Sequence, residues 1–191
     1  MNNASVENFD LSNTGCGKSA LIKAIAGIWT HKDGTVSTWK PLQPPDAIFI
    51  PQTPYLSSGT IVDQVIYPLR STQVTINREQ VLTAITAANL SHLLDRFDTE
   101  EYLSLPQWNE LSPGEKQRIY FARLFYHRPI LAVLDEATSS TDEDTEIQMY
   151  QKCIDLTITL LSVGHRSSLK KFHKKIISIN RGGGWSLKYL D

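Results

Sequence analysis

The feature that most constrains how this chain can fold is a glycine-rich loop that leads directly into a helix. The loop consists of Ser12, Asn13, Thr14, Gly15, Cys16, Gly17, Lys18 and Ser19. Such a loop presents consecutive backbone N–H groups at the positive end of a helix dipole, where a phosphate binds well. Gly15 and Gly17 let the backbone approach phosphate oxygens closely, while Lys18 and the Ser19 hydroxyl suit the β/γ-phosphates and Mg²⁺. Because Ser12 stands where the strict pattern has glycine, a glycine turn before an ordinary helix stays open as the alternative.

Short apolar runs alternate with helical patterns along the rest of the chain. The runs that predict strands cover residues 47–50, 130–134, 157–163 and 176–179. The patterns that predict helices cover residues 18–29, 79–94 and 114–127. Two of the apolar runs lack clean alternation, as in strands buried on both faces of a parallel sheet. The chain is therefore predicted to be an α/β domain with a mostly parallel sheet, closed by a hairpin over residues 181–190.

Composition and charge argue against several other classes of protein. The 191 residues include 19 Lys and Arg against 20 Asp and Glu, for a formal net charge of −1. A surface that binds nucleic acid needs a clustered basic excess, which this balance does not indicate. No apolar run reaches the roughly 18–20 residues of a membrane-spanning helix, and the first residues lack the pattern of a secretory signal. Cys16 and Cys153 fit no metal or redox spacing, so we interpret both as reduced thiols of a protein that faces the cytosol.

An acidic pair follows one of the predicted strands directly. Asp135 and Glu136 come after the apolar run at 130–134. Open α/β sheets bind ligands at the carboxyl ends of their parallel strands, where Asp135 could hold Mg²⁺ through water and Glu136 could polarise an attacking water. A solvated strand end is the plain alternative. Asp135 lies 117 positions after Lys18 in the sequence, which leaves room for an inserted subdomain between two nucleotide-binding halves. This separation favours a role for the acidic pair in nucleotide binding over a solvated strand end.

A second helix start carries a strong capping pattern. Ser112 suits the N-cap, Pro113 the first helical position and Glu115 the third, which completes a capping box. Capping alone would explain these residues. The same pattern also predicts a second helix end that can bind phosphate, far in sequence from the first. Two such ends in one small domain suggest a nucleotide held between two subunits.

Together these elements resemble the nucleotide-binding domain of ATP-binding-cassette (ABC) transporters. Six motifs follow the order of that family: Walker A at 13–19, the Q-loop at Gln52, the signature at 111–115, Walker B at 131–135 with Glu136, the D-loop at 140–142 and the switch histidine His165. Stretches at 50–55, 59–68, 121–126, 165–169 and 182–185 resemble the subfamily D half-transporters of peroxisomes and lysosomes. The form of the signature is most similar to the lysosomal, cobalamin-linked branch.

The resemblance implies roles for individual residues and an organisation of the domain. The implied ATP-binding residues are Asn13, Thr14, Gly15, Cys16, Gly17, Lys18, Ser19, Ala20, Gln52, Ser112, Gly114 and Glu115. Ser19, Gln52 and Asp135 are the implied Mg²⁺ ligands, and Glu136 and His165 are the implied catalytic residues. The implied organisation is a RecA-like core at about residues 1–66 and 128–191, with a helical subdomain at about residues 67–127.

The chain also departs from the family's pattern. Ser12 replaces a Walker A glycine, and Pro113 replaces a signature glycine and so removes one backbone donor. The family's N-terminal antiparallel β region, with its adenine-stacking aromatic residue, has little room before the loop, and the membrane domain is not in this chain. We therefore expect a truncated β region, in a fragment of a longer half-transporter or in a shortened paralogue.

The predicted function is ATP hydrolysis that powers transport as part of an ABC half-transporter. The implied partners are a second nucleotide-binding domain and a transmembrane domain, in cis or in trans, and no nucleic acid. The implied location is the cytosolic face of a peroxisomal, lysosomal or endoplasmic reticulum membrane. Two alternatives stay open: a soluble ABC ATPase that is not coupled to transport, and a truncated nucleotide-dependent interaction module with little or no hydrolysis.

Overall fold

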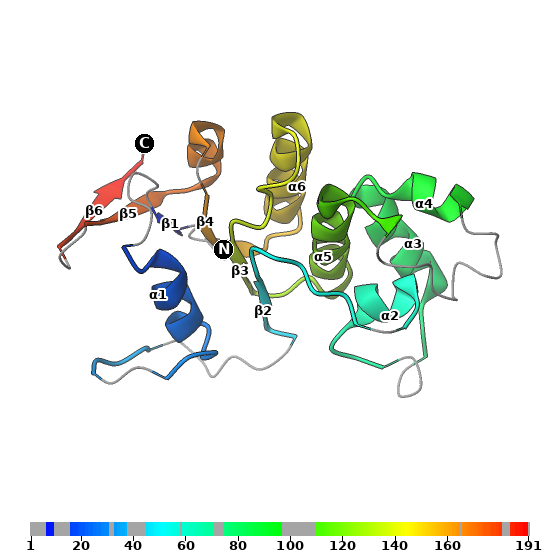
Figure 1. Cartoon of the computed structure of the whole chain (residues 1–191), viewed down its shortest axis with the longest axis horizontal. Coiled ribbons are helices and arrows are strands. Elements are labelled where there is room, and N and C mark those ends of the chain that lie inside the picture. Colours follow the sequence, from blue (N-terminus) through cyan, green and yellow to red (C-terminus); the bar gives the residue numbers. More distant parts are fainter. Residues whose placement is uncertain are drawn as a thin grey trace. The chain divides into compact units, whose positions relative to one another are not determined.

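Two compact units make up the chain (Figure 1). The computed structural model describes residues 7–9, 16–30, 33–37, 45–57, 59–70, 75–96, 110–164, 166–180 and 184–190. The sheet unit comprises Met1–Gln52, Pro129–Ala137 and Thr157–Asp191. The helical unit comprises Thr53–Arg128 and Thr138–Leu156. Each unit is therefore assembled from segments that are far apart in the sequence.

The sheet unit contains a six-stranded sheet in the order β2-β3-β4-β1-β5-β6. Its strands are β1 (Glu7–Phe9), β2 (Ala47–Ile50), β3 (Leu131–Asp135), β4 (Thr159–Val163), β5 (Lys175–Ile179) and β6 (Trp185–Tyr189). All neighbouring strands pair in parallel except β5 and β6, which form an antiparallel hairpin. Asp135 lies opposite Val163 in the register of β3 and β4. The carboxyl ends of these two central strands therefore coincide.

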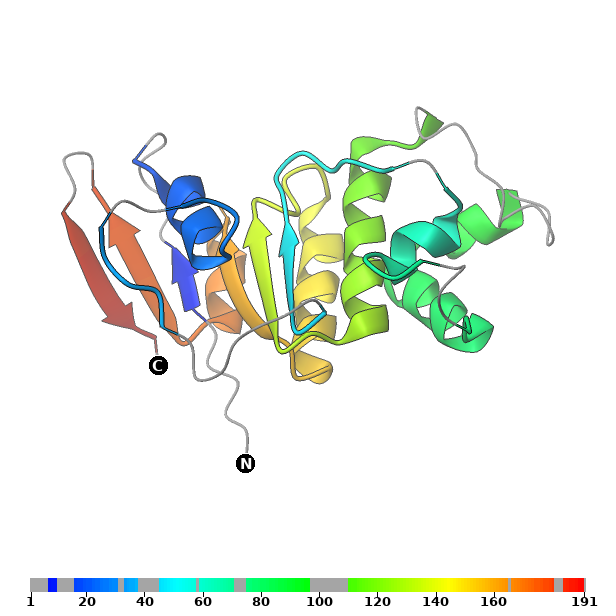
Figure 2. The ribbon, with the colours of Figure 1, turned by 90° about the horizontal axis from the view of Figure 1, so that it is seen from below.

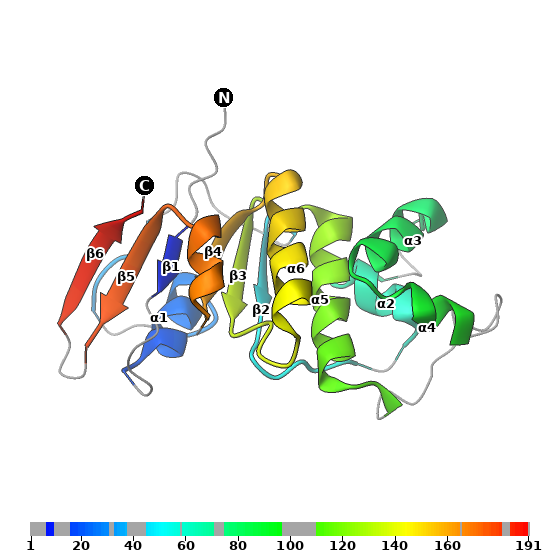
Figure 3. The ribbon, with the colours of Figure 1, turned by 90° about the horizontal axis from the view of Figure 1, so that it is seen from above.

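Two short helices lie on opposite faces of this sheet. The helix α1 (Lys18–Ile25) covers one face and the 3₁₀ helix η3 (Ser167–Phe172) lies on the other, as Figures 2 and 3 show from the two sides. Ile22 of α1 is fully buried in a cluster with Val133, Leu161 and Val163. Burying an aliphatic side chain of this size stabilises a fold by about 1.5–3 kcal/mol. This packing holds α1 against β3 and β4.

The helical unit is built around one buried helix. Its elements are α2 (Ile61–Ile66), α3 (Arg78–Ala87), α4 (Ser91–Arg96), α5 (Pro113–His127) and α6 (Glu143–Asp155). Residues 119–125 of α5 are all buried. The ring of Phe121 lies 6.2 Å from that of Phe125 and 6.4 Å from that of Tyr150 in α6, centroid to centroid. A helix that is buried on most sides forms the interior of its unit, and α5 has that role here.

The α/β fold class with a mostly parallel sheet is confirmed, and so is the C-terminal hairpin. The helix expected at residues 79–94 is instead two helices, α3 and α4, because Asn89 has a φ of 56° and interrupts the helical path. Sequence patterns do not predict β1, α2 or α6. The predicted boundaries of a core at 1–66 and 128–191 and a subdomain at 67–127 stay a prediction. Among the described residues, no helix combines the length and the apolar character that crossing a membrane requires.

Candidate functional site

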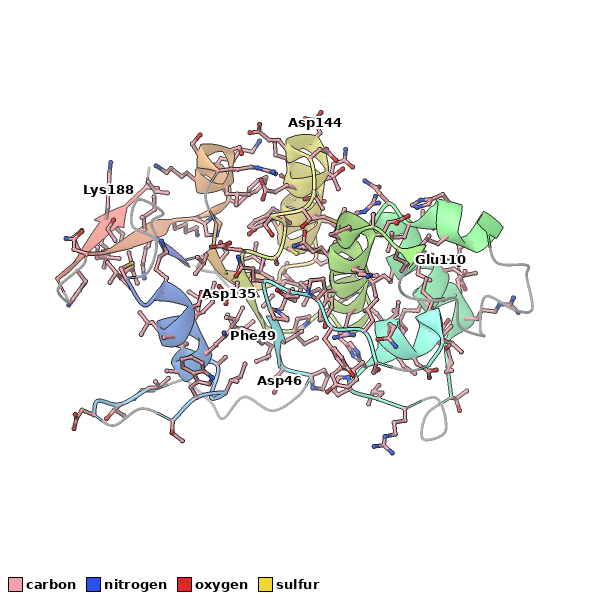
Figure 4. All side chains as sticks on the ribbon, viewed as in Figure 1. Asp46, Phe49, Glu110, Asp135, Asp144 and Lys188 are labelled. Atoms are coloured by element: carbon pink, nitrogen blue, oxygen red, sulfur yellow. The ribbon has the colours of Figure 1, made fainter. Side chains whose placement is uncertain are left out.

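The sheet unit brings the glycine-rich loop and the acidic strand end together. Gly17 is the N-cap of α1 and has a φ of 94°, a left-handed conformation that glycine adopts readily. The Ser19 hydroxyl donates a hydrogen bond of 2.7 Å to Oδ1 of Asp135, across 116 positions of sequence. Figure 4 shows Asp135 where β3 ends. A helix N-terminus and a carboxylate therefore share this corner of the sheet.

Two lysines of α1 add positive charge to the same corner. Lys18 is only 6% exposed. The Nζ atom of Lys23 lies 4.0 Å from Oδ2 of Asp135 and 5.1 Å from the ring centroid of Trp29. Because Asp135 is only 2% exposed, its charge needs compensation inside the protein. The Ser19 hydroxyl and the Lys23 ammonium supply it.

Glu136 sits at a sharp change of backbone direction after β3. Its φ is 49°, in a left-handed region that residues other than glycine seldom adopt. The Glu136 N–H donates a 2.9 Å hydrogen bond to the carbonyl oxygen of Val163 in β4. Its Oε2 accepts a 2.6 Å hydrogen bond from Nε2 of Gln52. Backbone strain of this kind gathers at functional sites, and here it presents the carboxylate to Gln52.

In the helical unit, the start of α5 forms the capping box that the sequence predicts. The Ser112 hydroxyl accepts from the Glu115 N–H at 3.2 Å, while the Ser112 N–H and hydroxyl both lie 2.8 Å from Oε2 of Glu115. Nε2 of His92 in α4 lies 2.7 Å from Oε1. Burial raises the pKa of Glu115, but the hydrogen bonds from His92 and Ser112 outweigh burial and lower the pKa to about 2. The Glu115 carboxylate is thus engaged by its own helix end.

The loop at residues 139–142 lies against this helix start. A Cβ atom on Gly114 would lie 2.9 Å from the Ser140 carbonyl oxygen, so the two backbones approach too closely for a larger residue. Gln117, which is 1% exposed, fixes the loop through its amide group. Its Nε2 donates to the Ser139 hydroxyl at 3.0 Å, and its Oε1 accepts from the Ser140 N–H at 2.9 Å. These contacts hold the start of α5 and the loop at residues 139–142 together.

A small pocket of about 290 Å³ opens between this loop and the start of α5. Its lining residues are Ser112, Pro113, Gly114, Arg118, Ser140, Thr141, Asp142 and Thr145. Asp142 caps α6 by accepting from the N–H and the hydroxyl of Thr145, at 2.8 and 2.7 Å, and these hydrogen bonds lower the pKa of Asp142. Pockets for small ligands usually span about 300–1,000 Å³, so the volume of this pocket lies at the lower end of that range.

Not every predicted site residue can be placed. Asn13, Thr14, Gly15 and His165 lie outside the described residues. Cys16 and Ala20 are half-buried on either side of the α1 N-terminus. Their roles, like those of the other predicted site residues, stay predictions.

Sequence reasoning does not select two residues that take part in these contacts, Lys23 and Gln117. Lys23 lies four positions after Ser19, and Gln117 lies three positions after Gly114. Residues at these spacings share a helix face. A search for polar residues three or four positions after each predicted site residue could therefore have identified Lys23 and Gln117.

The oxygen atoms gathered in the sheet unit fit a hard cation. Mg²⁺ prefers carboxylate, hydroxyl and amide oxygens and usually keeps several waters and phosphate oxygens as ligands. Asp135, Ser19 and Gln52 carry groups of these types, and the first two already touch. The residues present therefore fit a Mg²⁺ ion.

The parallel sheet, the glycine-capped helix start and the acid at the end of the central strand define the class of P-loop nucleotide-binding domains. The sequence pattern of the ABC transporter family matches residues 12–139. The chain belongs to the ABC transporter family and is an ATP-binding domain of that family.

Several known proteins are similar to the chain. The human lysosomal cobalamin transporter ABCD4 is 42% identical over 181 residues, which cover 92% of this chain and 30% of that protein. An uncharacterized ABC transporter ATP-binding protein of Synechocystis is 40% identical, with 93% and 26% covered. ABC transporter D family member 2 of Dictyostelium discoideum is 39% identical, with 93% and 24% covered. The chain thus spans less than a third of the length of these relatives.

The fold is also similar to that of a solved ABC transporter, described as of metal-chelate type and inward-facing. The match has a TM-score of 0.70 and covers 99% of this chain and 73% of the other, at 23% sequence identity. At this identity the likeness supports the fold alone.

Proposed function

We propose that this chain is the ATP-hydrolysing part of an ABC half-transporter of the D subfamily. The observation that carries the proposal is the hydrogen bond between Ser19 and Asp135. It joins the hydroxyl of the phosphate-binding loop to the acid of the central strand, two groups that nucleotide hydrolysis needs side by side. The similarity to D-family transporters supports the assignment to transport.

The predicted site residues of the sheet unit have distinct roles in this proposal. The backbone N–H groups at the start of α1 and the Lys18 ammonium bind the phosphates. Ser19, Gln52 and Asp135 would hold Mg²⁺, which when bound would neutralise charge on the phosphate oxygens. Gln52 donates a hydrogen bond to the Glu136 carboxylate, which would orient a water and accept its proton. His165 would hydrogen-bond the terminal phosphate.

The pocket in the helical unit supports a second part of the proposal, namely hydrolysis by a pair of chains. Ser112 and Gly114 lie at a helix N-terminus beside the D-loop, where a phosphate bound to another subunit could be received. The partners are accordingly a second nucleotide-binding domain and a transmembrane domain in cis or in trans. The proposed location is the cytosolic face of a lysosomal, peroxisomal or endoplasmic reticulum membrane.

Lys18→Ala tests the assignment of the phosphate-binding loop. Removing a cation from the β/γ-phosphates should weaken Mg·ATP binding by about 1.5–3 kcal/mol, or roughly ten- to over a hundredfold in affinity. Titration calorimetry on both proteins measures the change. Lys170→Ala, which removes an exposed lysine of η3, is the matched control and should bind like the parent. Equal affinities for Lys18→Ala and the parent would contradict the assignment.

The pairing of chains is tested by phosphate release over about a hundredfold range of protein concentration. Specific activity should rise with concentration in the parent, and Ser112→Arg should abolish the rise while leaving ATP binding nearly intact. Constant specific activity in both would favour an ABC ATPase that acts without a partner subunit. ATP binding with no hydrolysis at any concentration would favour a nucleotide-dependent interaction module.

A further inference from the structure

A buried histidine that the proposed mechanism does not use ties η3 to the sheet. His173, the residue after η3, is 4% exposed, and Ser162 of β4 is completely buried. Nε2 of His173 lies 2.8 Å from the Ser162 hydroxyl oxygen, and Nδ1 lies 2.8 Å from the Leu169 carbonyl oxygen. One imidazole therefore links β4 to the 3₁₀ turn that follows it.

The chemistry of these groups defines the state of the ring. A carbonyl oxygen can only accept, so Nδ1 of His173 carries the proton that it donates to Leu169. In the neutral ring Nε2 is then the acceptor, and the Ser162 hydroxyl donates to it. Burial lowers the pKa of His173 to about 4, against a smaller opposing effect of the hydrogen bond to Leu169, so the ring is neutral near pH 7.

The turn between β4 and η3 is packed closely around this link. Leu169 is 1% exposed, and a Cβ atom on Gly164 would lie 2.8 Å from its Cδ1 atom. Only glycine fits at that position without a shift of the leucine. The chain that leaves β4 is therefore held between the Leu169 side chain and the bond from Ser162 to His173.

The end of β4 in turn supports Glu136. The Val163 carbonyl oxygen, one residue after Ser162, accepts the hydrogen bond from the Glu136 N–H at 2.9 Å. Val163 is also the register partner of Asp135. Glu136 has a left-handed φ of 49°, a conformation that persists only where its surroundings hold it. The Val163 carbonyl is one of the groups that hold it.

We propose that His173 is a positioning residue for ATP hydrolysis, which fixes the end of β4 so that Val163 holds the backbone of Glu136 in place. Ser162 acts with it as the second half of the link. The inference rests on the proposed function for its catalytic consequence and on the hydrogen bonds above for its geometry.

Hydrogen exchange in the whole chain tests the geometry without requiring any activity. The Glu136 amide is the reporter at the end of β4, and the Thr159 amide, which donates to the Ile130 carbonyl at 3.0 Å, is the reference at its start. His173→Asn keeps a donor near Leu169 but removes the acceptor for Ser162, and Ser162→Ala removes the other half of the link. Each should speed exchange at Glu136 by about tenfold or more and leave Thr159 unchanged.

Two comparisons separate positioning from general loss of stability. The double variant should exchange no faster at Glu136 than the single variants do, because both remove the same link. Ile48→Val, a core substitution in β2, should not change exchange at Glu136 relative to Thr159. Exchange at Glu136 that is unchanged in His173→Asn, or raised only as much as at Thr159, would overturn the proposal.

Steady-state kinetics tests the catalytic consequence. Both single variants should lower kcat by about ten- to a hundredfold and leave KM for ATP within about twofold, since they misplace Glu136 without touching the phosphate-binding loop. An unchanged kcat in a parent that hydrolyses ATP would refute the catalytic role of the link. If the parent does not hydrolyse ATP, the proposed function fails, and the exchange experiment still decides whether His173 holds the end of β4.

Discussion

The two units build their functional ends in different ways. In the sheet unit the selected side chains bond to one another across long stretches of sequence, Ser19 to Asp135 and Gln52 to Glu136. In the helical unit Ser112 and Glu115 are three positions apart and satisfy each other in a capping box. In the first arrangement, the polar groups could exchange these hydrogen bonds for contacts with a bound ligand and its metal. In the second arrangement the polar groups of Ser112 and Glu115 already satisfy each other. The start of α5 then forms the rim of the pocket lined by Ser112, Pro113 and Gly114.

From this difference we expect substitutions in the two units to have different effects. Substitutions at the acidic end of the sheet unit should change turnover more than they change stability. Substitutions at the start of α5 should change stability and the surface proposed to receive a phosphate from another subunit, without altering the groups proposed to hydrolyse ATP in this chain's own sheet unit. The following predictions test that division, beginning with the largest expected effect.

Glu136→Gln should have the largest effect and should act on turnover alone. The change keeps the shape of the side chain and removes its ability to accept a proton, so single-turnover hydrolysis should fall by roughly 10²–10⁴-fold. Mg·ATP affinity and the urea midpoint of unfolding should stay close to those of the parent. Unchanged hydrolysis would show that another group accepts the proton. It would contradict the assignment of Glu136 as the catalytic base of the sheet unit.

Acid should destabilise the sheet unit through His173. Its pKa is about 4 in the fold against an ordinary value of 6.5, so the unfolded chain binds the proton more readily between these pH values. Stability should therefore fall as the pH drops from about 6.5 to 4, by no more than about 3–4 kcal/mol from this residue. Urea unfolding at several pH values measures the slope.

The control for this prediction is the His173→Asn variant, which lacks the titrating ring. Burial also lowers the pKa of His127 in the helical unit, so part of the acid sensitivity should remain in the variant. Parallel curves for parent and variant would contradict the role of His173 as the main source of the slope.

Gly114→Ala should disturb the rim in the helical unit. The new Cβ would lie 2.9 Å from the Ser140 carbonyl oxygen, and relieving that contact should cost about 1–3 kcal/mol of the free energy of unfolding. Gly184→Ala, where the nearest atom would lie at 3.8 Å, is the matched control. Equal unfolding midpoints for the two variants would mean that the loop at residues 139–142 is not held as tightly as the comparison requires.

His92→Ala should have the smallest effect. It removes one partner of Glu115 but leaves the capping box, and an exposed pair of this kind is worth about 0.2–1 kcal/mol. The pKa of Glu115 should rise from about 2 toward its ordinary value of 4.5, which an NMR titration of the carboxyl group would show. The stability that this low pKa contributes is present above about pH 4.5 and is lost as the pH falls toward 2. An unshifted Glu115 would assign the low pKa to Ser112 alone.

Several elements could be predicted because their causes are local. The helix expected at 114–127 is found at Pro113–His127, since Ser112, Pro113 and Glu115 specify its start within four residues. The helix expected at 79–94 divides because Asn89 adopts a left-handed conformation that periodicity does not reveal. The strand β1 has three residues and forms only because β4 and β5 flank it, so no pattern within it is long enough to indicate a strand.

The sequence by itself determined the class of this protein, through a glycine that tolerates the left-handed start of α1, an acidic pair after a buried strand, and a capped second helix. These signals are readable because each depends on neighbours within a few residues. Only the tertiary structure decided which distant groups meet: Asp135 with Ser19, Glu136 with Gln52, and His173 with Ser162. Strand order and register set those contacts, and both depend on packing among segments far apart in the chain, which no local pattern encodes.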